Sequence, residues 1–78
     1  TIVVMGDGRT NLRGSGAGVV RRLRERSRGV LWLCPEPRSS WGLGDSAMPE
    51  LAAAATETIA VQSGRDLEEA ARRLVRFR

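Results

Sequence analysis

The sequence predicts an α/β fold in three layers, with three parallel strands in a βαβαβα order. Three short apolar runs alternate with three segments of helical periodicity. The expected strands are residues 2–5, 30–34 and 58–62, and the expected helices are residues 17–28, 48–55 and 66–77. No repeat and no linker interrupts this alternation, so the 78 residues are expected to form a single domain unit.

The first two strands are continuously apolar. Residues 2–5 read Ile-Val-Val-Met and residues 30–34 read Val-Leu-Trp-Leu-Cys. Runs of this kind are typical of parallel strands that are buried on both faces. Glycines follow the first strand and allow a sharp turn, and Pro35 ends the second. We therefore expect helices to cover both faces of both strands.

The helices have recognisable ends and apolar stripes. The stripe of the first helix is Val19, Val20, Leu23 and Ser27. Gly29 is expected to stop this helix in the left-handed conformation, and Ser46 to cap the second. Residues 66–69, Asp-Leu-Glu-Glu, have the form of a capping box that opens the third helix. The buried stripe of that helix is expected to be Leu67, Ala70, Ala71, Leu74 and Phe77.

The composition excludes several function classes. Cys34 is the one cysteine, so there is no internal disulfide and no cysteine-rich metal site, and a reducing compartment such as the cytoplasm is expected. The chain does not begin with Met, which suggests a piece of a longer protein. No apolar run reaches the roughly 20 residues that span a bilayer, and no signal peptide is visible. His, Lys and Tyr are absent, which removes the usual general bases. We expect Cys34 to be a buried structural thiol and the protein not to be an enzyme.

All 13 basic residues are arginines, and the net charge is +4. Five of the arginines fall within residues 21–28. They could form a phosphate-binding face, because arginine binds phosphate in a bidentate manner. We favour a solvated helix face in a protein with GC-rich codons, a bias that also explains the missing Lys and Tyr. Nucleic-acid-binding domains usually interleave aromatic residues, and here these are few, so nucleic acid is not an expected partner.

Asp7 is the strongest candidate for a functional residue. It follows the first strand directly, and ligands of open α/β sheets bind at the carboxyl ends of the strands. Glu36 and Asp45 also come after strand ends, so the three carboxylates could gather into an ion site. Asp7 could instead accept a backbone hydrogen bond in an Asx turn.

Other residues of these loops also allow two interpretations. Arg9 and Asn11 either fix the loop, which we favour, or contact a ligand. Trp41 and Asp45 form either a recognition surface or a loop that is held in place by packing of the tryptophan.

A glycine-rich stretch gives an alternative function. Gly6 and Gly8, with the glycines of residues 14–18, suggest a dinucleotide-binding loop in a small Rossmann-like domain that binds nucleotide or nucleic acid. The spacing Gly-x-Gly-x-x-Asn departs from that motif, and the absence of Lys excludes a Walker A loop.

Two stretches carry a family resemblance. Residues 6–11, Gly-Asp-Gly-Arg-Thr-Asn, resemble the loop after the fourth strand of von Willebrand factor A (VWA) domains. Residues 32–49, WLCPEPRSSWGLGDSAMP, resemble the pattern W-L-N-P-E-P-x-x-x-W-G-x-G-D-S-x-M of CoxE-like bacterial intracellular VWA domains. Cys34 stands at the Asn of that pattern. The resemblance implies that residues 1–78 are the carboxyl-terminal half of a VWA domain, with the last three strands of its Rossmann-like sheet.

The resemblance also implies a function. VWA domains of this type bind proteins through Mg²⁺ at a metal-ion-dependent adhesion site (MIDAS), and many work with MoxR-type AAA+ ATPases. Asp7 is the one ligand of that site within these residues. Its rim would comprise Gly6, Gly8, Arg9, Asn11, Glu36, Trp41 and Asp45. An Asp-x-Ser-x-Ser loop and a Thr would lie upstream, so we expect weak or no Mg²⁺ binding by the isolated chain.

The missing half has a further consequence in this comparison. Residues 2–5 would lie beside a strand that these 78 residues do not contain. Their unpaired edge carries no charge or proline, so we expect a homodimer that pairs residues 2–5 across a two-fold axis.

Overall fold

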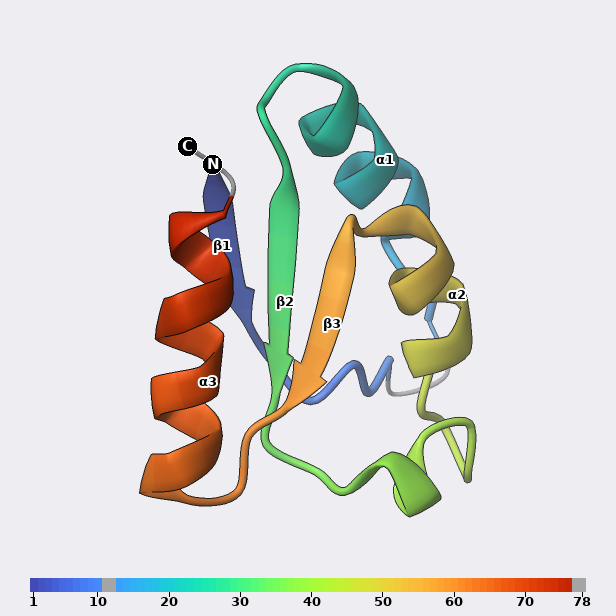
Figure 1. The fold of residues 1–78 in the computed structure, drawn as a ribbon. Coiled ribbons are helices and arrows are strands. Elements are labelled where there is room, and N and C mark those ends of the chain that lie inside the picture. Colours follow the sequence, from blue (N-terminus) through green and yellow to red (C-terminus); the bar gives the residue numbers. More distant parts are fainter. Residues whose placement is uncertain (11–12, 77–78) are drawn as a thin grey trace.

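The computed structural model describes residues 1–10 and 13–76, and its elements alternate as the sequence predicts (Figure 1). In chain order they are β1 (Ile2–Met5), α1 (Ala17–Glu25), β2 (Val30–Cys34), the 3₁₀ turn η1 (Arg38–Ser40), α2 (Met48–Ala54), β3 (Glu57–Ala60) and α3 (Gly64–Val75). The predicted βαβαβα order is confirmed. None of the helices in the described part of the chain is both long and apolar enough to cross a membrane.

The sheet is parallel and has the strand order β1-β2-β3. Val3 lies opposite Leu31, and Leu31 lies opposite Glu57 on the other side. Parallel pairing follows from the helical crossover between each pair of consecutive strands. The carboxyl ends of β1 and β2 therefore meet at one edge of the sheet, where Asp7 and Glu36 come next in the chain.

Helices cover both faces of the central strand, as predicted for residues 30–34. Figure 1 shows α1 and α2 on one side of the sheet and α3 on the other. All five residues of β2 are buried. Val30, Trp32 and Cys34 join the cluster beneath α1 and α2, while Leu31 and Leu33 join the cluster beneath α3. Successive side chains of a strand point to opposite faces, which explains this division.

The prediction that β1 is buried on both faces is wrong for these residues. Ile2 and Val4 pack partly against the cluster beneath α1 and α2. Val3 is 45% exposed and Met5 67% exposed on the opposite face. The buried cluster beneath α3 takes its residues from β2, β3 and α3 and includes none from β1.

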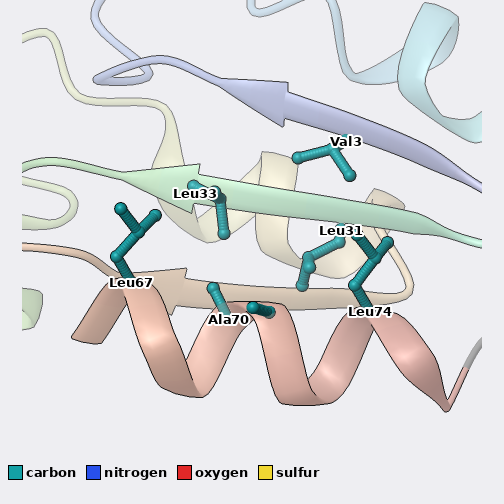
Figure 2. A pocket seen from close by; sticks show the side chains of 7 residues that line it. Val3, Leu31, Leu33, Leu67, Ala70 and Leu74 are labelled. Carbon is teal, nitrogen blue, oxygen red and sulfur yellow. The ribbon is translucent and has the colours of Figure 1, made fainter. Parts of the chain in front are cut away.

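An apolar groove therefore lies between β1 and α3 (Figure 2). It is lined by Val3, Leu31, Leu33, Leu67, Ala70, Ala71 and Leu74. The predicted stripe of α3 faces this groove but is only partly buried. Ala70 is 3% exposed, whereas Leu67, Ala71 and Leu74 are exposed. Phe77, the last residue of the predicted stripe, lies outside the described residues.

The end of α1 differs from the prediction. The helix stops at Glu25, three residues early, and Gly29 is not among the glycines with positive φ in the described residues. The Ser27 hydroxyl donates to the Leu23 carbonyl at 2.8 Å, which closes the last turn without a left-handed glycine. Val19, placed on the apolar stripe, is exposed, while Val20 is buried.

The other boundaries shift by a few residues. The N-cap residue of α2 is Ala47, although the Ser46 hydroxyl accepts from the Met48 N–H at 3.4 Å. Residues 57–60, rather than 58–62, form β3. The capping box of α3 begins at Ser63, not at Asp66, and the Ser63 hydroxyl accepts from the Asp66 N–H at 3.2 Å. The Asp66 carboxylate accepts from the Gln62 N–H at 2.9 Å, one residue before the N-cap Ser63, so the return contact is a variant of the usual box, in which the N-cap N–H donates.

Candidate functional site

The loops that follow β1 and β2 are joined at the carboxyl edge of the sheet. Arg9 and Ser46 form an isolated antiparallel bridge. The Ala47 N–H donates to the Gly8 carbonyl at 2.8 Å, and the Thr10 N–H donates to the Asp45 carbonyl at 3.2 Å. Residues 8–10 are therefore hydrogen-bonded to residues 45–47 along the backbone.

Gly6 and Gly8 flank Asp7 in the turn after β1. The Trp32 indole N–H donates to the Gly6 carbonyl at 2.9 Å. Gly8 has a φ of 72°, and a Cβ atom there would lie 2.5 Å from the Met48 sulfur. Only glycine fits this position, because it has no Cβ and tolerates positive φ. These two predicted rim residues position Asp7 through the backbone.

Asp7 itself is exposed and is held at one carboxylate oxygen. Its Oδ1 accepts a hydrogen bond from the Arg9 N–H at 2.9 Å, which is the geometry of an Asx turn. No described residue donates to its Oδ2. The Cys34 thiol is completely buried, and its sulfur lies 3.8 Å from the Asp7 carbonyl oxygen. The turn is therefore fixed while no described residue occupies the second carboxylate oxygen, and the predicted burial of Cys34 is confirmed.

The Arg9 side chain joins the two loops. Its Nε and one terminal nitrogen donate to the two Glu36 carboxylate oxygens at 2.9 and 2.6 Å. The other terminal nitrogen donates to Asp45 Oδ1 at 3.0 Å and to the Leu43 carbonyl at 2.9 Å. Planar guanidinium groups favour such forked contacts with carboxylates. The expectation that Arg9 fixes the loop is confirmed.

This arrangement overturns the predicted cluster of three carboxylates. Glu36 and Asp45 both neutralise Arg9, and their hydrogen bonds, that of Glu36 first, raise the pKa of Arg9 above its usual range. Arg9 therefore stays charged and keeps both carboxylates in ion pairs. Across residues 1–10 and 13–76, no three acidic, Cys or His side chains are grouped so that they could hold one. The position of Glu36 and Asp45 after strand ends did not predict that both would pair with Arg9.

Trp41 anchors the long loop against the core. Its indole N–H donates to the Glu36 carbonyl at 3.1 Å, and its ring packs against the cluster beneath α1 and α2. The Arg38 guanidinium lies 4.6 Å from the ring centroid. Of the two interpretations of Trp41, the structure therefore supports a loop held in place by the tryptophan.

Three residues that the sequence analysis did not assign to the site complete the junction. The Ser46 hydroxyl accepts from the Gly42 N–H at 3.0 Å, and the Thr10 hydroxyl donates to the Asp45 carbonyl at 3.3 Å. The third is Trp32, through its contact with Gly6. A tryptophan inside a buried strand is a usable signal, because its N–H needs an acceptor when buried. Asn11, predicted at the rim, lies outside the described residues.

The fold and the loops at the carboxyl edge of the sheet define the class of protein. A parallel three-stranded sheet, covered on both faces and carrying an exposed aspartate after its first strand, is a Rossmann-like α/β unit. The model of one family, described as VWA domain containing CoxE-like protein, matches residues 1–70. The chain belongs to this family of VWA domains. Comparisons with curated proteins and with solved structures gave no match.

Proposed function

We propose that the chain acts in a protein-binding VWA domain of the Mg²⁺-dependent MIDAS type, to which it contributes the Asp7 carboxylate. The observation that carries this proposal is the open Asp7 oxygen at the carboxyl edge of a VWA sheet. Asp7 would hold the cation directly or through a water molecule. An acidic side chain of the bound protein would complete the coordination of the metal.

The described residues can supply one ligand to a Mg²⁺ site, but they cannot form the whole site. Mg²⁺ takes six oxygen ligands in near-octahedral geometry and commonly keeps several waters. Asp7 offers one free carboxylate oxygen, and the two other carboxylates of this edge are committed to Arg9. The remaining ligands, an Asp-x-Ser-x-Ser loop and a Thr, are proposed to lie outside this chain. Arg9 keeps the two loops joined so that Asp7 holds its position.

The partner and the setting belong to the same proposal. A MoxR-type AAA+ ATPase is the proposed protein partner, with the chain itself non-enzymatic and placed in the cytoplasm. The lack of His, Lys and Tyr supports a binding role, since the usual general bases are missing.

Asp7→Asn tests the metal proposal. The variant keeps an oxygen that accepts from the Arg9 N–H, so the turn should survive, but it removes the negative charge. In the longer protein with the upstream ligands, calorimetric titration with Mg²⁺ is expected to show about tenfold weaker affinity, because fewer charged ligands weaken hard-cation binding. Glu50→Gln, which removes an exposed carboxylate of α2, is the matched control and should leave the affinity unchanged.

Two results contradict the proposal. Unchanged Mg²⁺ affinity in Asp7→Asn means that Asp7 is not a ligand, and the absence of an upstream Asp-x-Ser-x-Ser loop removes the site altogether. Titration with ATP in place of Mg²⁺ tests the alternative of a nucleotide-binding domain. Tight binding of ATP by the 78-residue chain would favour that alternative.

A further inference from the structure

The net charge of the molecule is concentrated in one segment. Residues 21–28 contain five arginines and one glutamate, which gives a charge of +4. The other 70 residues contain eight arginines and eight acidic residues, so they are neutral, and the whole chain carries +4. The segment comprises the second half of α1 and the turn that follows it.

The arginines of this segment are exposed, and none of them has a carboxylate partner within residues 1–10 and 13–76. They are Arg21, Arg22, Arg24, Arg26 and Arg28, which we call the α1 arginine surface. Every ion pair found among the described residues uses an arginine from elsewhere: Arg9, Arg72 or Arg73. The Arg22 Nε donates to the Gly18 carbonyl of its own helix at 3.4 Å. The carboxylates that form ion pairs in the described part of the chain therefore use other arginines, and none of them pairs with this surface.

The α1 arginine surface is separate from the Asp7 loops. Val20 is buried, and Leu23 packs partly against the same cluster, so the helix faces the core with these residues and not with its arginines. Helix α1 runs back from the carboxyl edge of the sheet to its amino edge. Figure 1 places the end of α1 and the turn before β2 at the opposite end of the molecule from the loop that carries η1.

The chemistry of the surface favours an acidic protein over a nucleic acid. Guanidinium groups form forked hydrogen bonds with carboxylates and phosphates alike. However, residues 17–29 contain no aromatic side chain on which a base could stack, as single-stranded nucleic acids require. Val19 on the same helix is 54% exposed and offers an apolar contact of the kind found within protein interfaces.

We propose that the α1 arginine surface docks an acidic protein segment, rich in Asp or Glu, at the amino edge of the sheet. Docking there needs neither Asp7 nor a metal ion, so it is a second interaction surface beyond the proposed Mg²⁺ site. Unpaired arginines attract such a segment over the Debye length, about 8 Å at physiological ionic strength. The attraction should raise the association rate and weaken as salt is added.

The experiment compares two double variants of equal net charge. Arg21→Gln/Arg24→Gln removes two charges from the surface, and Arg65→Gln/Arg76→Gln removes two exposed charges of α3 and its C-terminal end. Binding of a fluorescent oligoglutamate is measured by anisotropy at low and physiological salt, with circular dichroism to check the fold. The α1 double variant is expected to lose about fivefold in affinity, which corresponds to two exposed ion pairs. The α3 double variant should stay within about twofold of the unaltered chain.

Three results would overturn the proposal. If oligoglutamate does not bind, the α1 arginine surface is not a docking site for acidic segments. If both double variants lose affinity equally, the binding is not specific to α1. An oligothymidylate of the same length that binds more tightly than the peptide would assign the surface to nucleic acid. The measurement needs no Mg²⁺, so its failure would leave the Asp7 proposal untouched, and an Asp7→Asn chain should bind the peptide normally.

Discussion

Arg9 shows at the scale of one residue how a functional edge is built. A guanidinium is not a metal ligand, but this one determines which carboxylates at the edge are free of ion pairs. It pairs with Glu36 and Asp45 and does not pair with the Asp7 carboxylate. A buried or half-buried arginine with two carboxylates is stabilised by charge-assisted hydrogen bonds that are stronger than neutral ones. Among the described residues, the Asp7 carboxylate is therefore the one of the three that forms no ion pair, which is why the proposed cation site uses it.

Gly8 gives a sharp prediction at the same scale. Gly8→Ala places a methyl group 2.5 Å from the Met48 sulfur at a φ of 72°, so both packing and backbone are strained. We expect the free energy of unfolding to fall by about 2 kcal/mol, measured by urea denaturation. Gly14→Ala is the control, because a Cβ there meets nothing within 4 Å. Equal stability of the two variants would show that the turn is not held as described.

Some of the site could be read from the residues and some could not. Asp7 after β1 and a loop-fixing Arg9 were predictable, because strand ends and turn chemistry are local properties. The capture of Glu36 and Asp45 by Arg9 was not, since it joins residues 27 and 36 positions apart. Such pairs depend on how two loops pack against one another, and the spacing of the residues along the chain does not predict this packing.

At the scale of elements, the buried strand was the most predictable part. Residues 30–34 are apolar throughout, and a central parallel strand is the position that needs this pattern. The same pattern in residues 2–5 gave a wrong prediction of burial on both faces. The burial of an edge strand depends on which elements pack beside it. Helix ends were displaced where side-chain hydroxyls bond the backbone, at Ser27 and at Ser63. A chain has several hydroxyls able to do this, and tertiary packing selects among them.

Leu33→Ala tests whether β2 is the core. Leu33 is 5% exposed and belongs to the cluster beneath α3. Its truncation should cost roughly 2–5 kcal/mol of unfolding free energy, a large part of the stability of a small domain. Leu43→Ala, at a leucine that is 60% exposed on the long loop, should change the urea midpoint little. Matching midpoints for the two variants would contradict the assignment of the core.

At the scale of the whole molecule, two surfaces are unfinished in different ways. Among the described residues, the arginines of the α1 arginine surface form no ion pair, and the outer edge of β1 has no strand beside it. Backbone bonds from Ile2 to Gly29 and from Gly6 to Leu33 show which groups of β1 face β2. The peptide groups of Val3 and Met5 alternate with these and therefore face away from the sheet. Neither a charge nor a proline blunts this edge.

The edge predicts self-association of the 78-residue chain by itself. Two β1 strands pairing antiparallel across a two-fold axis would satisfy the free groups of both copies and join two three-stranded sheets into one. Sedimentation at high micromolar concentration should show a dimer.

Met5→Lys places a charge on the edge strand and should give a monomer, because charged edges resist pairing. Leu67→Lys introduces the same charge at an exposed apolar residue of α3, away from the edge, and should remain dimeric. If Leu67→Lys dissociates the dimer while Met5→Lys does not, association runs through the groove of Figure 2 and not through β1. A monomeric unaltered chain at that concentration would exclude both routes.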